Sequence, residues 1–192
     1  IPAVKEPKEK ADWKFIEVAD TDGEGRLILC SVVNHAAMND NPELIITLAT
    51  LCGSTEGMLG YLVAAAISRT QLLLDEIATA GRITSEIYST TRMSLDVVEE
   101  YLGDYEGTVA DFQNTNWDVP IGDTLQAFCL INNFADKVPF LHLDICGTAY
   151  LPWAIVKRSK RSLPEGATGW GVASVTEFLK RYVKNGSIVE PA

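Results

Sequence analysis

Hydrophobic residues recur along the chain in two patterns that predict alternating strands and helices. Short apolar or alternating runs, bounded by turn residues, predict strands over 13–18, 43–49 and 139–145. Apolar residues at helical spacing predict helices over 27–38, 71–78, 121–134 and 172–183. The run over 58–68 fits either a buried strand or a core helix, and 84–105 is expected to form short helices. This alternation indicates an α/β fold, with a mixed, mainly parallel sheet sandwiched between helices.

Length and composition point to one domain over residues 1–192. A chain of 192 residues with 47% hydrophobic content can bury one sizeable core. Residues 1–12 are expected to form a polar lead-in, and the start at Ile1-Pro2 suggests a processed, cloned or cut product. No apolar run is long enough to span a bilayer, so we expect no membrane partner.

The charge balance argues against nucleic acids and anionic membranes as partners. The formal net charge is −10, whereas nucleic acids and anionic membranes require clustered cations. The basic cluster over 157–161 is interpreted as a solvated loop rather than a binding patch, because aromatic residues do not interleave with it. The cysteines lack CxxC spacing and lie in apolar runs, which favours small buried hydrophobes in a reducing, cytoplasmic compartment over zinc ligands. They are Cys30, Cys52, Cys129 and Cys146.

An acidic turn over 20–26 joins the first predicted strand to the first predicted helix. It groups three carboxylates with a guanidinium, which is costly unless a cation lies among them. Asp22 and Glu24 are two positions apart on a non-helical turn, so both can aim at one point and bind one or two divalent ions. Arg26 is then free to orient an anion or stabilise developing negative charge. A bare surface turn and a calcium loop are the alternatives, although the later bidentate glutamate of an EF-hand is missing.

Two small-residue loops, 50–54 and 146–149, follow predicted strands. Ligands of open parallel sheets bind at the carboxyl ends of the strands, so these loops are candidate ligand-binding segments. Four polar residues are expected to have structural roles, within the core or in holding loop backbone: His142, Asp144, Asp111 and Asn114.

Five segments, in order along nearly the whole chain, resemble signatures of the M17 leucine aminopeptidase family. The segments and the signatures they resemble are 20–27 (NTDAEGRL), 49–53 (ATLTG), 110–114 (AD-x-x-N), 142–149 (HLDIAGTA) and 166–172 (GATGxGV). The turn departs from its signature at Asp20, where the family has Asn, and at Gly23, where it has Ala.

The resemblance implies an enzyme that removes N-terminal residues, leucine-like ones by preference, from peptides with the help of two divalent metal ions: zinc, manganese or magnesium. Carried over position by position, it makes Asp22 and Glu24 metal ligands, with Glu24 bridging the ions. It gives Arg26 a catalytic role, the holding of a bicarbonate-like anion that shuttles a proton. The remaining implied residues contact the substrate main chain (Thr50, Leu51, Gly53) or wall the side-chain pocket (Cys146).

The resemblance also implies partners and an incomplete site. Family members are typically hexamers, so a homo-oligomer is expected. The family takes further metal ligands and a catalytic lysine from a KxxxxDSGG segment upstream of the turn, which these residues lack. We therefore expect the C-terminal part of a catalytic domain, with the missing N-terminal part as its partner and little activity alone. The alternatives are an inactive pseudoenzyme or structural subunit with the same fold, and a simple metal-binding module.

Overall fold

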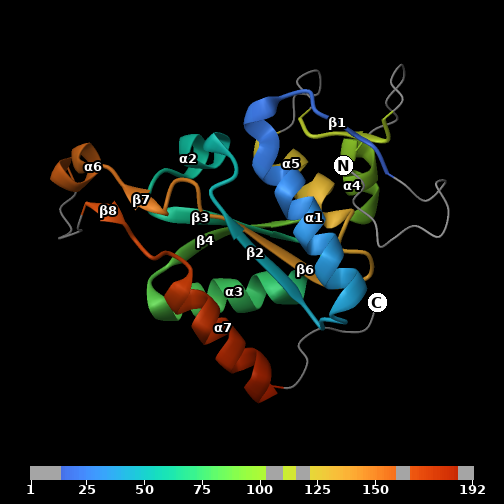
Figure 1. The fold of residues 1–192 in the computed structure, drawn as a ribbon. Helices are drawn as coiled ribbons and strands as arrows, with labels where there is room; N and C mark the ends of the chain where they lie inside the picture. The colour runs from blue at the N-terminus through green and yellow to red at the C-terminus, as the bar shows by residue number, and fades with distance from the viewer. Residues whose placement is uncertain (1–13, 103–109, 116–121, 159–164, 186–192) are drawn as a thin grey trace.

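The computed structural model describes residues 14–102, 110–115, 122–158 and 165–185 (Figure 1). The strands are β1 (Ile16–Glu17), β2 (Ile45–Ala49), β3 (Val63–Ser68), β4 (Ile87–Arg92), β5 (Phe112–Gln113), β6 (Phe140–Asp144), β7 (Tyr150–Leu151) and β8 (Gly166–Ala167). The helices are the short 3-10 helix η2 (Thr21–Gly23) and the α-helices α1 (Glu24–Asn39), α2 (Gly53–Leu59), α3 (Gln71–Thr84), α4 (Leu95–Leu102), α5 (Asp123–Asn132), α6 (Trp153–Arg158) and α7 (Val172–Asn185).

A four-stranded sheet with the order β2-β6-β3-β4 forms the centre of the molecule. The pairs β2–β6 and β3–β4 are parallel, and β6 runs antiparallel to β3 between them. Two small sheets lie outside it, a parallel pair β1–β5 and an antiparallel pair β7–β8. The central sheet is therefore mixed and mainly parallel, as the alternation of apolar runs predicts.

Helices cover both faces of this sheet. Figure 1 shows α1, α4 and α5 on one face and α3 and α7 on the other. Alternate residues of β6 serve the two layers, since Phe140 packs in the cluster of the first face whereas Leu141 and Leu143 pack with α3 and α7. All five residues of β6 are buried, which is typical of a central strand with both faces covered.

The sequence-based expectation for residues 84–105 is wrong in part. These residues were expected to form short helices, but among those that the structure describes Thr84 ends α3, Ile87–Arg92 is the strand β4 and Leu95–Leu102 is a short helix. Among the described strands, β4 pairs only with β3, and its Ser-Thr-Thr centre is partly exposed, so it lacks the apolar run of a buried strand. The ambiguous run over 58–68 resolves into β3, where three alanines pack between the helical layers.

Other expectations hold with small changes of boundary. The expected strand over 13–18 narrows to β1, and its first residue lies outside the described part of the chain. Most of the basic cluster over 157–161 also lies outside the described residues. Among the helices that the structure describes, none has the length and apolarity needed to cross a membrane.

Substituting alanine for Gly81 is expected to destabilise the fold by about 2 kcal/mol, because the added methyl group overpacks a tight helix–strand contact. A Cβ at this position in α3 would collide with the carbonyl oxygen of Glu86 and approach Cδ2 of Tyr88 to 2.9 Å. Urea denaturation measures the change in the free energy of unfolding. Gly57→Ala in α2 is the control, since a Cβ there meets nothing within 4 Å and alanine is the better helix former. Equal effects of the two substitutions would contradict the packing argument.

Candidate active site

The acidic turn over 20–26 contains η2 and the first residues of α1, and it presents two free carboxylates. Asp20 precedes η2, and its Oδ1 accepts a hydrogen bond of 3.0 Å from the Asp22 backbone N–H. The expectation of a non-helical turn is wrong, because Asp22 lies within η2 and the helix expected from residue 27 already begins at Glu24, the first residue of α1. Both side chains are exposed. Neither carboxylate forms a hydrogen bond or ion pair with another described residue, so both are available to a ligand.

Asn114, beside β5, fixes the backbone of this turn from a distant part of the sequence. Its Oδ1 accepts hydrogen bonds from the backbone N–H groups of Ala19 (2.9 Å) and Asp20 (3.2 Å), and its Nδ2 donates to the carbonyl of Gly23 (3.3 Å). Asp111 Oδ2 accepts from the backbone N–H of Phe15 at 2.7 Å. The expectation that Asp111 and Asn114 hold loop backbone is confirmed.

Arg26 lies beneath the turn and is only 3% exposed. Its Nη1 donates to the Asn114 carbonyl (2.8 Å) and to Thr115 Oγ1 (3.1 Å). Its Nη2 donates to Cys52 Sγ at 3.5 Å and forms an ion pair with Asp123, the first residue of α5. The guanidinium therefore joins α1, α5 and two loops, and both terminal nitrogens are engaged by the protein.

These contacts do not fit an exchangeable bicarbonate at Arg26. The negative charge beside the guanidinium is the carboxylate of Asp123, and the Nε atom is buried without a partner among the described residues. Sequence reasoning missed Asp123. Its signal was weak: a carboxylate in the first turn of a helix is common, and nothing local reveals a partner 97 positions away.

The predicted substrate-contacting residues lie at the same end of the central sheet as the turn. Because β2 and β6 are parallel and Ala49 pairs with Asp144, the loops that follow them are neighbours; the N–H of Ile145 donates to the Ala49 carbonyl at 2.9 Å. Leu51 packs against the turn, since its Cδ1 lies 3.0 Å from where a Cβ of Gly25 would stand. Of the other predicted residues, Thr50 is exposed and Cys146 half-buried in these loops, and the exposed Gly53 is the first residue of α2.

Buried polar groups support the loops from below. Asp144 accepts hydrogen bonds from Thr55 Oγ1 (2.9 Å) and from the N–H of Cys146 (3.1 Å), and burial raises the pKa of Asp144. His142 shares its strand face but bonds elsewhere, with Nδ1 2.8 Å from Thr47 Oγ1. Both residues have the structural roles expected from the sequence.

Three of the four cysteines are buried, as predicted. Burial raises the pKa of the Cys30 and Cys129 thiols to about 12, and it raises that of Cys52 as well. Thiols in this state are inert rather than nucleophilic or metal-binding. Cys146 is partly exposed in its loop.

Acidification should destabilise the chain through His142. Burial lowers the pKa of His142 to about 4, from an ordinary value of 6.5, so between these values only the unfolded state takes up the proton. Stability is therefore lost as pH falls from about 6.5 towards 4, by about 2 kcal/mol between pH 7 and pH 5. Urea denaturation of the wild type and His142→Gln at both pH values tests this. Equal pH dependence of the two proteins would rule His142 out as the cause, because Asp144 is common to both.

The turn alone does not provide a complete metal site. Across the described residues, no group of three or more His, Cys, Asp and Glu side chains could hold a metal ion. Asp22 and Glu24 have the ligand chemistry that divalent ions require, with open carboxylate oxygens on a clamped backbone. Two carboxylates are nevertheless too few for a tightly held catalytic ion.

Together these features define an α/β protein with a carboxylate-bearing turn beside two loops at the carboxyl ends of parallel strands. The catalytic-domain model of the cytosol aminopeptidase family matches residues 9–176. The chain therefore belongs to the cytosol aminopeptidase family, the M17 family that its motifs resemble.

Individual relatives agree with this assignment. The chain is 35% identical over 175 residues to a probable cytosol aminopeptidase of Protochlamydia amoebophila (strain UWE25), a match that covers 90% of this chain and 33% of the relative. It superposes on the bottromycin maturation enzyme BotP with a TM-score of 0.77 and 28% identity, covering 91% of this chain and 36% of BotP. A mutant of tomato leucine aminopeptidase matches with a TM-score of 0.73 and 31% identity over 89% of this chain and 31% of that one. The chain thus spans about a third of the length of its relatives.

Proposed function

We propose that this chain supplies part of the active site of a metal-dependent aminopeptidase that releases N-terminal residues, leucine-like ones by preference, from peptides. The observation that carries the proposal is the pair of open carboxylates, Asp22 and Glu24, on a turn that Asn114 clamps beside the loops after β2 and β6. Family membership supports the peptidase chemistry.

In this proposal Asp22 and Glu24 would be among the ligands of two divalent ions, and Glu24 would be a ligand of both. The bound ions would supply Lewis acidity for a water and for the scissile carbonyl. Zinc, manganese and magnesium are the candidates, and BotP has been solved in complex with Mn. The side chains of this pair suit these ions because they are unpaired, exposed carboxylates at the start of a helix.

The loops are proposed to bind the peptide. Thr50, Leu51 and Gly53 follow β2 and would contact the substrate main chain, with Gly53 leaving open space above the backbone. Cys146 follows β6 and would form part of the wall of the side-chain pocket. Arg26 would act here by fixing α1, and with it the turn, against α5 through Asp123.

The rest of the site is proposed to come from protein outside these residues. The chain spans about a third of its relatives, and β2 forms an open edge of the described sheet. Ile28 and Val32 on α1 are 61% and 59% exposed, an apolar stripe that a further segment or subunit could cover. An assembled homo-oligomer in the cytoplasm, in keeping with the relatives' description as cytosol aminopeptidases, completes the proposal.

Hydrolysis of leucine amide with added Mn²⁺ or Zn²⁺ tests the proposal. We expect chelator-sensitive turnover by the parent protein and little or none by the isolated 192 residues. Robust turnover by the isolated chain would refute the proposal that it carries only part of the active site. A parent protein that folds but has no activity would refute the peptidase assignment.

An inactive, structural subunit with the same fold is the second candidate. The observation that favours it is the Arg26–Asp123 ion pair, which occupies the guanidinium expected to hold a catalytic anion. An intact metal-binding parent without peptidase activity would select this alternative.

A further inference from the structure

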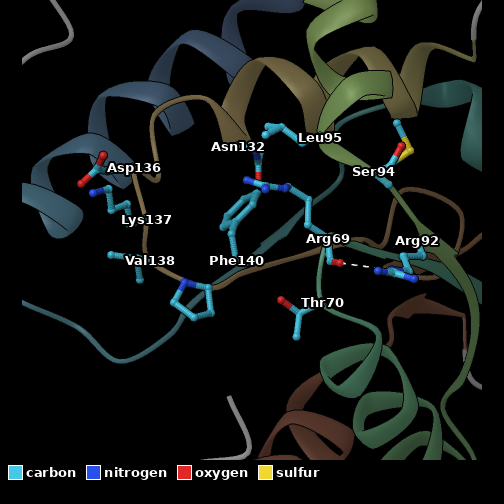
Figure 2. Close-up of a pocket in the computed structure, with 12 residues that line it drawn as sticks. Arg69, Thr70, Arg92, Ser94, Leu95, Asn132, Asp136, Lys137, Val138 and Phe140 are labelled. Carbon is cyan, nitrogen blue, oxygen red and sulfur yellow. Dashed lines mark hydrogen bonds between the residues drawn. The ribbon is translucent and has the colours of Figure 1, made fainter. Parts of the chain in front are cut away.

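A second candidate site lies at the opposite end of the central sheet from the acidic turn. A cavity of about 410 Å³ opens where β3 and β4 end and β6 begins (Figure 2). Its lining includes Phe140, the first residue of β6, whereas the loops of the candidate active site follow the last residue of that strand, Asp144. The two sites share no residue.

The cavity lining carries an excess of positive charge in an acidic protein. Arg69 follows β3, Arg92 ends β4 and Lys137 precedes β6, so three separate segments contribute one cation each. Among the described residues of the lining, Asp136 has the only carboxylate, which leaves these residues with a formal charge of +2. The Nε of Arg92 donates a hydrogen bond of 3.4 Å to the main-chain carbonyl of Arg69 (Figure 2). The whole chain has a net charge of −10, so this local excess is contrary to the general composition.

Two helices also begin at the cavity. Thr70 and Leu95 line it, and they stand at the N-termini of α3 and α4. The start of α3 has no side-chain cap, so its first backbone N–H groups have no side-chain acceptor at Thr70. Unpaired N–H groups and the positive end of the helix dipole both favour an anion at such a position.

A nearly buried amide faces this space without a partner. Asn132 is only 9% exposed, and its side chain forms no hydrogen bond with the rest of the described chain. Figure 2 shows it opposite the guanidinium of Arg69, which extends across the cavity above Phe140. The amide nitrogen is open to the cavity, so it is available to donate a hydrogen bond to a ligand there.

We propose that this cavity binds a small organic phosphate, separately from the peptidase site. The phosphate lies against the guanidinium of Arg69, where a dianion matches the +2 lining, and Asn132 donates to one of its oxygens. Arg92, Lys137 and the start of α3 add to the positive potential of the cavity. The organic part lies on the apolar surface of Phe140 and Pro139. Phosphate is favoured over a carboxylate because three cations, an amide and a hydroxyl at Ser94 exceed the acceptor needs of one carboxylate.

Isothermal titration of the 192-residue chain with phenyl phosphate, inorganic phosphate and benzoate tests this. We expect phenyl phosphate to bind, inorganic phosphate to bind more weakly, and benzoate to bind weakest. Arg69→Gln should lower the affinity for phenyl phosphate about tenfold, the loss of one charge-assisted hydrogen bond. Arg92→Gln should lower it less, because it removes a charge of the lining without removing that hydrogen bond. Arg82→Gln removes an exposed cation of α3 that lies outside the cavity, and it should leave the affinity for phenyl phosphate unchanged.

Asn132→Asp provides a second test, since it keeps the side-chain shape and places a negative charge against the phosphate. Loss of binding in this variant, with an unchanged circular dichroism spectrum, is expected; if it unfolds, the two arginine variants decide. Absence of phenyl phosphate binding, equal binding of benzoate, or equal effects of Arg69→Gln and Arg82→Gln would overturn the proposal. None of these outcomes bears on the peptidase function, because no variant touches the acidic turn.

Discussion

Replacing Glu24 with alanine is expected to reduce leucine-amide turnover by the parent protein more than about a hundredfold, because the loss of even an outer partner of a metal ligand costs about 10–100-fold. The fold should survive. The Glu24 side chain is exposed and unpaired among the described residues, and its loss removes only the interaction of a charge with the start of α1, about 0.3–1 kcal/mol. Steady-state kinetics and urea denaturation of the same preparations measure both quantities.

A matched variant separates the metal role from a general effect of charge. Glu43→Ala removes another exposed carboxylate, one that precedes β2 and lies outside the turn. It should leave turnover within about twofold of the wild type, since surface substitutions away from special features have small effects. A Glu24→Ala enzyme as active as Glu43→Ala would show that Glu24 is not a metal ligand. Restored activity at high Mn²⁺ concentration would instead locate the defect in metal affinity.

The main outline of the fold was predictable because the buried strands and amphipathic helices obey simple periodicity. The apolar runs of β2 and β6 and the spacing in α1, α3, α5 and α7 each match an element. The edge strand β4 was not predictable in this way, since it packs through Tyr88 while its Ser-Thr-Thr centre is partly exposed. Half-exposed polar strands carry little hydrophobic signal, and neighbouring strands decide their state.

The candidate site, like the fold, was predictable only in part. The turn and the two loops were recognisable as local motifs, and the parallel pairing of β2 with β6 explains why they meet at one end of the sheet. The engagement of Arg26 by Asp123 was not predictable, because it depends on a residue far along the chain. Asp123 is brought to Arg26 by the packing of α1 against α5, which no motif around either residue encodes.

The Arg26–Asp123 ion pair is the basis of a second prediction, a large loss of stability when Asp123 is replaced. Asp123→Ala should destabilise the chain by about 3 kcal/mol, since removal of one partner from a buried ion pair leaves an uncompensated charge. The estimate lies at the low end of the usual range because the Asp123 side chain is 34% exposed, whereas that of Arg26 is 4% exposed. Urea denaturation of the 192-residue chain measures the loss.

Lys14→Ala supplies the matched control for this substitution. Lys14 pairs with Asp111 at 3.6 Å, but the two side chains are 51% and 34% exposed, and such surface pairs contribute about 0–1 kcal/mol. If Asp123→Ala lowers the free energy of unfolding no more than Lys14→Ala does, water solvates the Arg26 guanidinium well enough to replace Asp123. The double variant Arg26→Leu with Asp123→Ala isolates the pair itself, since a positive coupling free energy requires that the two side chains interact.

Small anions distinguish an internal counter-ion from an exchangeable one. If Asp123 takes the place of a bound anion, Asp123→Ala opens a space next to Arg26, and formate or bicarbonate should raise the stability of that variant while leaving the wild type unchanged. Stabilisation of the wild type by bicarbonate to the same extent would mean that Arg26 accepts an external anion despite Asp123, which restores the role implied by the family motif. Rescue of the variant alone would make the carboxylate of Asp123 a built-in replacement for that anion, because both then satisfy the same buried guanidinium.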